Sequence, residues 1–121
     1  MCPKESHKIL VVDDDADIRE VLREVLTESG HDVMTAANGL EALHILRQGW
    51  GPCMVLLDLM MPVMDGYHFL AERKNDPALA SIPITVITAG RQVDMERLDD
   101  ATLVAKPIRL PALMSLIEKT C

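Results

Sequence analysis

The feature of this sequence that most limits its possible folds is the alternation of short apolar runs with longer amphipathic segments. The apolar runs lack the polar alternation of a half-exposed strand, which favours parallel strands buried on both faces. They are Ile9–Val12, Cys53–Leu57, Ile84–Ile87 and Leu103–Ala105, with a weaker fifth run at Asp32–Ala36. The sequence therefore predicts five strands in one parallel sheet.

The segments between these runs have the spacing of amphipathic helices. In the first, the apolar residues of Ile18–Leu26 recur at helical intervals, with charged residues between them. Asn38 and Asp65 are suitable N-caps for a second and a third helix, and the leucines from Leu110 onward mark a last one. Residues 91–100 have only a faint helical pattern, so any helix in this fourth crossover is expected to be short.

Strand and helix alternate along the whole chain, which is typical of an α/β fold. The pattern predicts a doubly wound parallel sheet with right-handed crossovers and helices on both faces. The 121 residues match the size of one ordinary domain, and no repeat or linker divides them. We therefore expect a single domain over residues 1–121, with its core at about 8–120.

Charge and cysteine usage narrow the classes of partner. The 19 acidic residues outnumber the 12 basic ones, and the formal net charge of −7 disfavours direct binding of nucleic acid or anionic membranes. Cys2, Cys53 and Cys121 have no spacing typical of a zinc site or a disulfide framework. No stretch has the length of a membrane span. We expect a cytoplasmic protein without membrane insertion.

Polar residues of complementary chemistry follow the predicted strands at their carboxyl ends. They are Asp13, Asp14, Asp58, Thr88 and Lys106. Ligands of open parallel sheets bind outside this edge, and carboxylates from two neighbouring strands suit a hard divalent ion such as Mg²⁺. A facing ammonium and hydroxyl would offset charge on a phosphoryl group and donate a hydrogen bond to it. The sequence therefore predicts a magnesium-assisted phosphoryl site.

Other polar residues near this edge have a structural interpretation. Asp15 and Asp17 would favour the positive end of the helix that follows them, so we leave both off the site. The four histidines share no spacing and are interpreted as surface or packing residues, not as ligands.

Four segments, KILVVDDD, MVLLDLMMPVMDG, ITVITA and AKP, resemble in order and interval the receiver domain of two-component response regulators. The likeness is to single-domain, chemotaxis-regulator-like members, and it runs from Lys8 to about Thr120. It implies a flavodoxin-like sheet with strand order 2-1-3-4-5. Gly66 matches the glycine that follows the loop beyond the acceptor.

The resemblance also implies a site and its partners. Asp58 would be the phospho-acceptor, Thr88 would bond the phosphoryl group and Lys106 would pair with it. Ligands of Mg²⁺ would be Asp14, Asp58 and the backbone carbonyl of Met60, with Asp13 acting through water. The donor would be a sensor histidine kinase or a histidine phosphotransfer protein, and a downstream protein target would read the switched surface.

Two departures from the family pattern concern the output side. Leu103 stands where receivers often have an aromatic residue, and the interval from Thr88 to Lys106 is short by about one helical turn, or four residues. The main alternative is a receiver-like interaction module that does not depend on phosphorylation. An independent enzyme ranks third, because the only activity expected is the chain's own phosphorylation and dephosphorylation.

Overall fold

The computed structural model describes residues 8–88, 93–98, 101–106 and 109–120. Five parallel strands form one sheet in the order β2-β1-β3-β4-β5. Their bounds are Lys8–Val12 (β1), Asp32–Ala36 (β2), Met54–Asp58 (β3), Ile84–Thr88 (β4) and Thr102–Ala105 (β5). The predicted strands and their order are confirmed, including the weaker second strand.

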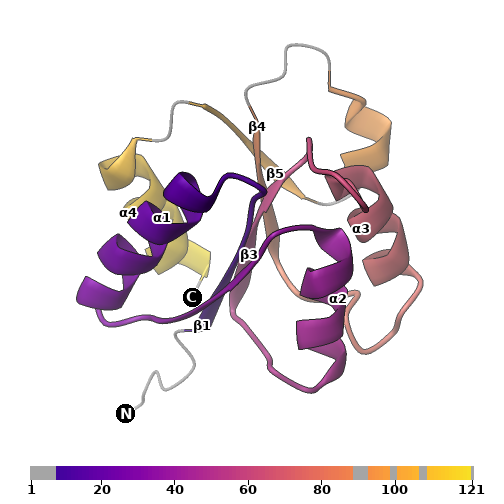
Figure 1. The fold of residues 1–121 in the computed structure, drawn as a ribbon, viewed down its shortest axis with the longest axis horizontal. Coiled ribbons are helices and arrows are strands. Elements are labelled where there is room, and N and C mark those ends of the chain that lie inside the picture. Colours follow the sequence, from indigo (N-terminus) through magenta and orange to yellow (C-terminus); the bar gives the residue numbers. More distant parts are fainter. Residues whose placement is uncertain (1–7, 89–92, 99–100, 107–108, 121) are drawn as a thin grey trace.

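Helices cover both faces of this sheet. Within the described residues they are α1 (Ala16–Glu28), α2 (Gly39–Arg47), α3 (Gly66–Lys74) and α4 (Leu110–Thr120). Figure 1 shows α1 and α4 on one face of the sheet and α2 and α3 on the other. The predicted caps are present, because the side chain of Asn38 accepts from the Glu41 amide and that of Asp65 from the His68 amide. The doubly wound α/β fold is therefore confirmed.

The connection from β4 to β5 differs from the other crossovers. Among its described residues, the helical part is a single 3₁₀ turn of four residues, η1 (Met95–Leu98), whereas the other crossovers carry helices of 9 to 13 residues. This confirms the expected shortening. Leu98 is buried and joins the core beside α3. The β4–β5 connection is therefore short but still anchored in the apolar interior.

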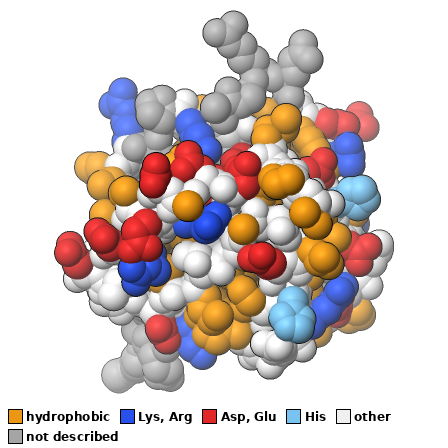
Figure 2. Space-filling view, viewed as in Figure 1, with side chains coloured by type: hydrophobic (Ala, Val, Ile, Leu, Met, Phe, Trp, Pro, Cys, Tyr) orange, Lys and Arg blue, Asp and Glu red, His pale blue; other side chains and the backbone are white. Residues whose placement is uncertain are grey.

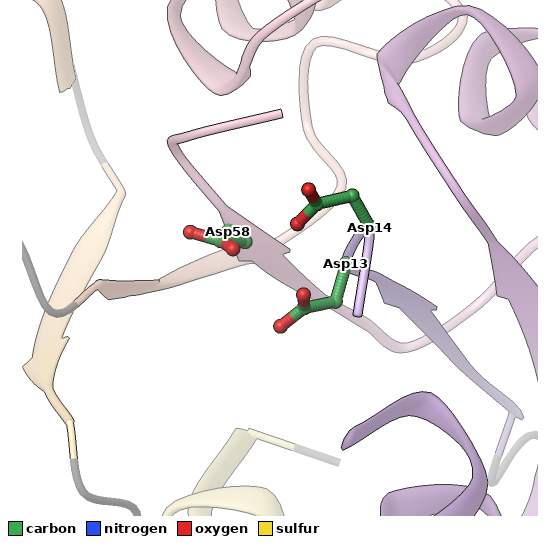
Figure 3. A group of neighbouring side chains, drawn as sticks. All are labelled: Asp13, Asp14 and Asp58. Atoms are coloured by element: carbon green, nitrogen blue, oxygen red, sulfur yellow. The ribbon is translucent and has the colours of Figure 1, made fainter. Parts of the chain in front are cut away.

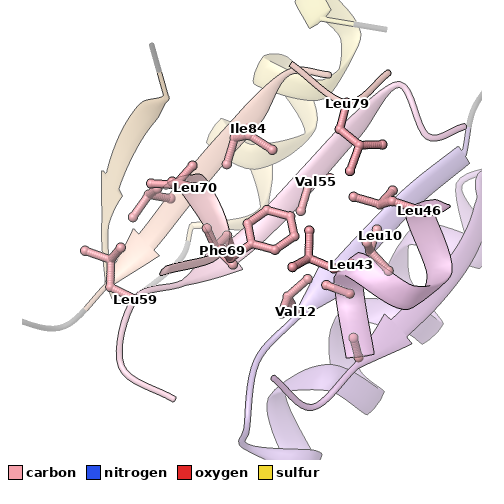
Figure 4. Close-up of a cluster of buried hydrophobic side chains, with 14 of the residues drawn as sticks. Leu10, Val12, Leu43, Leu46, Val55, Leu59, Phe69, Leu70, Leu79 and Ile84 are labelled. Carbon is pink, nitrogen blue, oxygen red and sulfur yellow. The ribbon is translucent and has the colours of Figure 1, made fainter. Parts of the chain in front are cut away.

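Two apolar layers hold the sheet between its helices. One layer lies on the α2 and α3 side, where the ring of Phe69 is surrounded by aliphatic side chains (Figure 4). The other lies on the α1 and α4 side and includes Leu22, Leu26, Leu113 and Ile117. Because β1, β3 and β4 contribute to both layers, they are buried on both faces. Burial on both faces holds the carboxyl ends of these three strands in place.

Cys53 differs from the sequence expectation. It is disulfide-bonded, whereas the cysteine spacing gave no sign of a disulfide framework. Cys2 and Cys121 lie outside the described residues. Whether two cysteines can form a disulfide depends on their distance in the fold, which sequence spacing alone does not show.

The surface separates charged from apolar regions in part. In Figure 2, acidic and basic side chains are mixed on the side where α1 lies, and hydrophobic side chains gather over the side of α2 and α3. Across the described ranges, every helix is too short or too polar to cross a membrane.

Candidate functional site

Three carboxylates meet at the carboxyl edge of the sheet. Asp13 and Asp14 follow β1 directly, and Asp58 is the last residue of the neighbouring strand β3. One carboxylate oxygen from each residue lies within 4.8 Å of the other two. In Figure 3 the three side chains extend into the same space beyond the strand ends. The predicted clustering of Asp13, Asp14 and Asp58 is confirmed as geometry.

Asp13 is held by hydrogen bonds of both its backbone and its side chain. Its amide donates to the carbonyl of Ala36 at 3.1 Å, and its Oδ1 accepts from the amide of Asp15 at 2.9 Å. Asp15 is in turn the N-cap of α1, and its own side chain accepts from the amides of Asp17 and Ile18. The structural interpretation of Asp15 and Asp17 is therefore confirmed.

A lysine that directly follows β5 faces this acidic cluster. The Nζ atom of Lys106 lies 3.4 Å from Oδ2 of Asp13 and 3.6 Å from Oδ2 of Asp58. The amide of Lys106 donates to the carbonyl of Thr88 at 3.0 Å, and Thr88 ends β4 as a buried residue. Because β4 is the neighbour of β3, the hydroxyl-bearing Thr88 ends next to the strand that carries Asp58. The structure thus places all the predicted side chains along one edge.

Burial and neighbouring charges make Asp58 an unusual carboxylate. Removal from water raises the pKa of Asp58, and the negative charges of Asp13 and Asp14 raise it further. The amide of Met60, which donates to Oδ1 of Asp58 at 3.2 Å, and the ammonium of Lys106 oppose this rise in pKa. The charged form of Asp58 is therefore held in the site at a cost in folding free energy.

The loop after Asp58 contains a strained turn. The amide of Met64 donates to the carbonyl of Pro62 at 2.7 Å, which makes Val63 the central residue of a three-residue γ-turn. Val63 has a φ of 68°, and it is the sole residue other than glycine with a positive φ in the part of the chain described. A β-branched side chain rarely adopts this conformation. Backbone strain is thus stored within five residues of Asp58.

Gly66 brings the start of α3 against the end of β3. Its amide donates to the carbonyl of Leu59 at 2.9 Å. A Cβ atom on Gly66 would lie 2.7 Å from the Cα of Leu59, closer than real Cβ atoms approach. Glycine is therefore required here for a close backbone approach, and the contact fixes where the loop after Asp58 ends.

The donor set of this edge fits a hard divalent cation. Asp13, Asp14 and Asp58 offer carboxylate oxygens alone, the ligands that Mg²⁺ prefers. Three carboxylates facing one ammonium leave two negative charges without a partner inside the cluster. Asp14 is exposed, so a partly hydrated ion has access from solvent. The residues present therefore match the charge and ligand type of Mg²⁺.

Arg19 is a polar neighbour of the site that the sequence analysis did not single out. Its Nη1 atom donates to the backbone carbonyl of Asp13 at 2.6 Å. Arg19 comes one turn after the N-cap Asp15, and its amide donates to the Asp15 carbonyl. The sequence did contain a signal for this contact: a basic residue stands one turn after the N-cap of a helix that follows an acidic loop.

Comparison with known proteins gives the family. The chain matches the model of the response regulator receiver domain over residues 9–118. It is 36% identical over 118 residues to sporulation initiation phosphotransferase F of Bacillus subtilis, covering 94% of this chain and 93% of that protein. The chain therefore belongs to the receiver domain family of response regulators, which works in phosphorelay signalling.

Two further relatives bear on the site and on chain length. The response regulator TrrA of Thermotoga maritima, solved in complex with Mg²⁺ and BeF, is 32% identical, with a TM-score of 0.83 and coverage of 94% of this chain and 98% of that one. The CpxR homologue of Haemophilus influenzae, a transcriptional regulatory protein, is 41% identical over 88 residues. The match covers 72% of this chain but 37% of that relative's length.

Proposed function

We propose that Asp58 accepts a phosphoryl group from the phosphohistidine of a sensor histidine kinase or a histidine phosphotransfer protein, and that the reaction depends on Mg²⁺. The observation that carries the proposal is the meeting of Asp13, Asp14 and Asp58 with Lys106 at one sheet edge, in a chain of the receiver family. The relatedness to a phosphotransferase of sporulation supports a place in a phosphorelay.

In this proposal, a carboxylate oxygen of Asp58 attacks the phosphorus atom, the bond from phosphorus to the imidazole nitrogen breaks, and the imidazole leaves with that electron pair. The ammonium of Lys106 pairs with the phosphoryl oxygens, which it can reach because it already lies 3.6 Å from Oδ2 of Asp58. The hydroxyl of Thr88 donates a hydrogen bond to them. Water later hydrolyses the acyl phosphate and restores the Asp58 carboxylate.

Asp13, Asp14, Asp58 and the backbone carbonyl of Met60 would hold the metal ion in this proposal, Asp13 through water. When bound, Mg²⁺ would supply positive charge to the phosphoryl oxygens and offset the acidic cluster. The chain's own contribution is a preformed arrangement, because Asp13 and Asp58 are buried and are hydrogen-bonded to neighbouring amides. Little reorganisation is then required when the phosphoryl donor arrives.

The output is proposed to be a changed protein-binding surface that a downstream protein target reads, without direct contact to nucleic acid. Residues 1–121 are taken as one receiver domain, whether it acts alone or within a longer regulator, and it is expected to act in the cytoplasm. Leu103 is exposed on β5, and η1 stands where the other crossovers carry a longer helix. The switched surface on this side is therefore expected to differ from that of receivers with an aromatic residue at this position.

The test is the intact mass of the protein after incubation with Mg²⁺ and a small-molecule phosphoryl donor. We expect one added phosphoryl group in the native protein, and none in Asp58→Asn or after chelation of the metal. Circular dichroism of the variant checks that its fold is retained. If the native protein binds Mg²⁺ but gains no phosphoryl group from this donor or from a histidine kinase, the phosphorylation-independent interaction module becomes the better interpretation.

A further inference from the structure

Arg19 closes a ring of hydrogen bonds between the end of β1 and the start of α1. The amide of Asp15 donates to Oδ1 of Asp13 at 2.9 Å, and the amide of Arg19 donates to the carbonyl of Asp15 at 3.0 Å. The guanidinium of Arg19 then returns to the carbonyl of Asp13 at 2.6 Å. Three residues are thus joined in one closed loop of contacts.

This ring fixes the residue that leads directly into Asp14. The Asp13 carbonyl belongs to the peptide group that joins Asp13 to Asp14, so a hydrogen bond to that oxygen limits rotation of the whole peptide plane. The side chain of Asp13 is held separately by the Asp15 amide and by Lys106. The Arg19 bond therefore restrains the Asp13–Asp14 peptide, which these contacts to the Asp13 side chain do not reach.

We propose that Arg19 is a positioning residue for the metal site: its hydrogen bond to the Asp13 carbonyl holds the Asp13–Asp14 peptide so that both carboxylates face Asp58. The inference rests on the proposed function, because the site is the Mg²⁺ site described above. Partners that orient metal ligands from outside the coordination sphere commonly change metal affinity by about 10- to 100-fold when they are removed.

The charge of Arg19 and its hydrogen bond act in opposite directions, which makes the proposal testable. A positive charge beside the cluster opposes binding of a cation, so loss of the charge alone would strengthen Mg²⁺ binding. Loss of the hydrogen bond would weaken it. Arg19→Gln removes the charge and is too short to keep the bond, whereas Arg19→Lys keeps both the charge and a donor.

Arg23 provides a matched control on the same helix. It lies one turn further along α1, where it pairs with Glu20 and, among the residues that the structure describes, makes no hydrogen bond or ion pair with the acidic loop. Arg23→Gln therefore removes the same charge from the same helix without touching Asp13. The stability of all three variants is compared by thermal unfolding in the absence of metal.

The first measurement is Mg²⁺ affinity by isothermal titration calorimetry. We expect Arg19→Gln to weaken binding by about tenfold, Arg19→Lys to recover affinity to within about threefold of the native protein, and Arg23→Gln to change it by less than about twofold. Equal or tighter binding by Arg19→Gln would overturn the proposal and leave Arg19 with a purely electrostatic role.

A second measurement does not depend on the metal. Amide hydrogen exchange of Asp15, followed by NMR in the metal-free protein, reports directly on the ring, because this amide donates to Oδ1 of Asp13. We expect it to exchange at least about tenfold faster in Arg19→Gln, with amides of β4 unchanged. Unchanged exchange would overturn the positioning role. Failure of the native protein to bind Mg²⁺, with exchange still accelerated in the variant, would refute the proposed metal site and not the ring.

Discussion

The amino and carboxyl ends of the sheet each bury a charged side chain, but the two side chains have opposite surroundings. At the amino end, Arg73 is 1% exposed and donates to the carbonyl of Ile82 from Nε at 3.1 Å and from Nη2 at 2.7 Å. At the carboxyl end, Asp58 is 7% exposed and faces two further acids that raise its pKa. The amino end therefore stabilises the fold, and the carboxyl end keeps the carboxylate that we propose as the phospho-acceptor.

The largest expected effect is at the amino end. Arg73→Ala should lower the free energy of unfolding by about 3 to 5 kcal/mol, because it leaves a cavity and removes two donors from the carbonyl of the half-buried Ile82. Urea unfolding measures this. The control is Lys119→Ala on α4, where the side chain is exposed, and it should change the free energy of unfolding by less than about 0.5 kcal/mol.

The same pair of variants tests whether the two ends are separate. At temperatures where Arg73→Ala remains folded, we expect phosphate uptake at Asp58 close to that of the native protein. A loss of unfolding free energy below about 1 kcal/mol would contradict the structural role of Arg73. A selective loss of phosphate uptake would contradict the separation of the two ends.

Gly66→Ala should have the second largest effect, at the carboxyl end. A methyl group 2.7 Å from the Cα of Leu59 forces backbone movement, which costs about 1 to 3 kcal/mol and displaces the loop after Asp58. We expect lower stability together with slower phosphate uptake. Gly51→Ala is the matched control, because a Cβ there meets no atom within 4 Å and its stability should stay within about 0.5 kcal/mol. Equal behaviour of the two variants would refute the close approach.

Most of the carboxyl end of the sheet could be predicted from the sequence. The strand ends that carry Asp13, Asp58 and Thr88 followed from apolar runs whose burial the structure confirms. The run before Lys106 was also expected to be buried, but as β5 at the edge of the sheet it is largely exposed. The short fourth crossover followed from the faint pattern at 91–100. These features are local: an apolar run and the residue after it are read from neighbouring positions, and parallel topology brings the strand ends to one edge.

The contacts that sequence analysis missed depend on tertiary geometry. Arg73 lies in a helix whose other charged residues are exposed, and no local pattern shows that its side chain turns inward to reach Ile82. The positive φ of Val63 is equally hidden, because a β-branched residue is the wrong type for such a turn. Both are positions where the surrounding structure overrides local preference.

Asp58→Asn should stabilise the metal-free protein, by about 1 kcal/mol, because it removes a buried charge from beside two like charges. The pH dependence has a definite sign. Burial and the neighbouring acids raise the folded-state pKa of Asp58 above the unfolded value of about 3.9. Between these two values the folded state binds more protons, so native stability falls as pH rises through that window.

The gain in the free energy of unfolding of Asp58→Asn over the native protein should therefore be largest at neutral pH. It should disappear below the pKa that Asp58 has in the unfolded state. Thermal unfolding at several pH values measures it. Asp32→Asn, an exposed change on β2, should show no comparable gain. Added Mg²⁺ should reverse the order of stability, because only the native protein keeps all three carboxylates for the ion. A gain that persists unchanged at low pH would contradict the electrostatic explanation.

The smallest effect concerns the strain stored beside Asp58. Val63 is 79% exposed at a φ of 68°, so its side chain contributes little packing to offset an unfavourable backbone conformation. Val63→Asn should raise the free energy of unfolding by about 0.5 kcal/mol, because asparagine tolerates positive φ. Val63→Gly removes the strain more fully, but its greater freedom in the unfolded chain offsets part of that gain.

These two variants separate strain from shape at the carboxyl end. Val63→Asn keeps the turn, so phosphate uptake should stay within about twofold of the native rate while the melting temperature rises by about 2 °C. Val63→Gly loosens the turn and should slow uptake more than Val63→Asn does. If both variants were less stable than the native protein, contacts of the valine side chain would favour the turn. The cost in folding free energy at the carboxyl end of the sheet would then come from the buried charge of Asp58 alone.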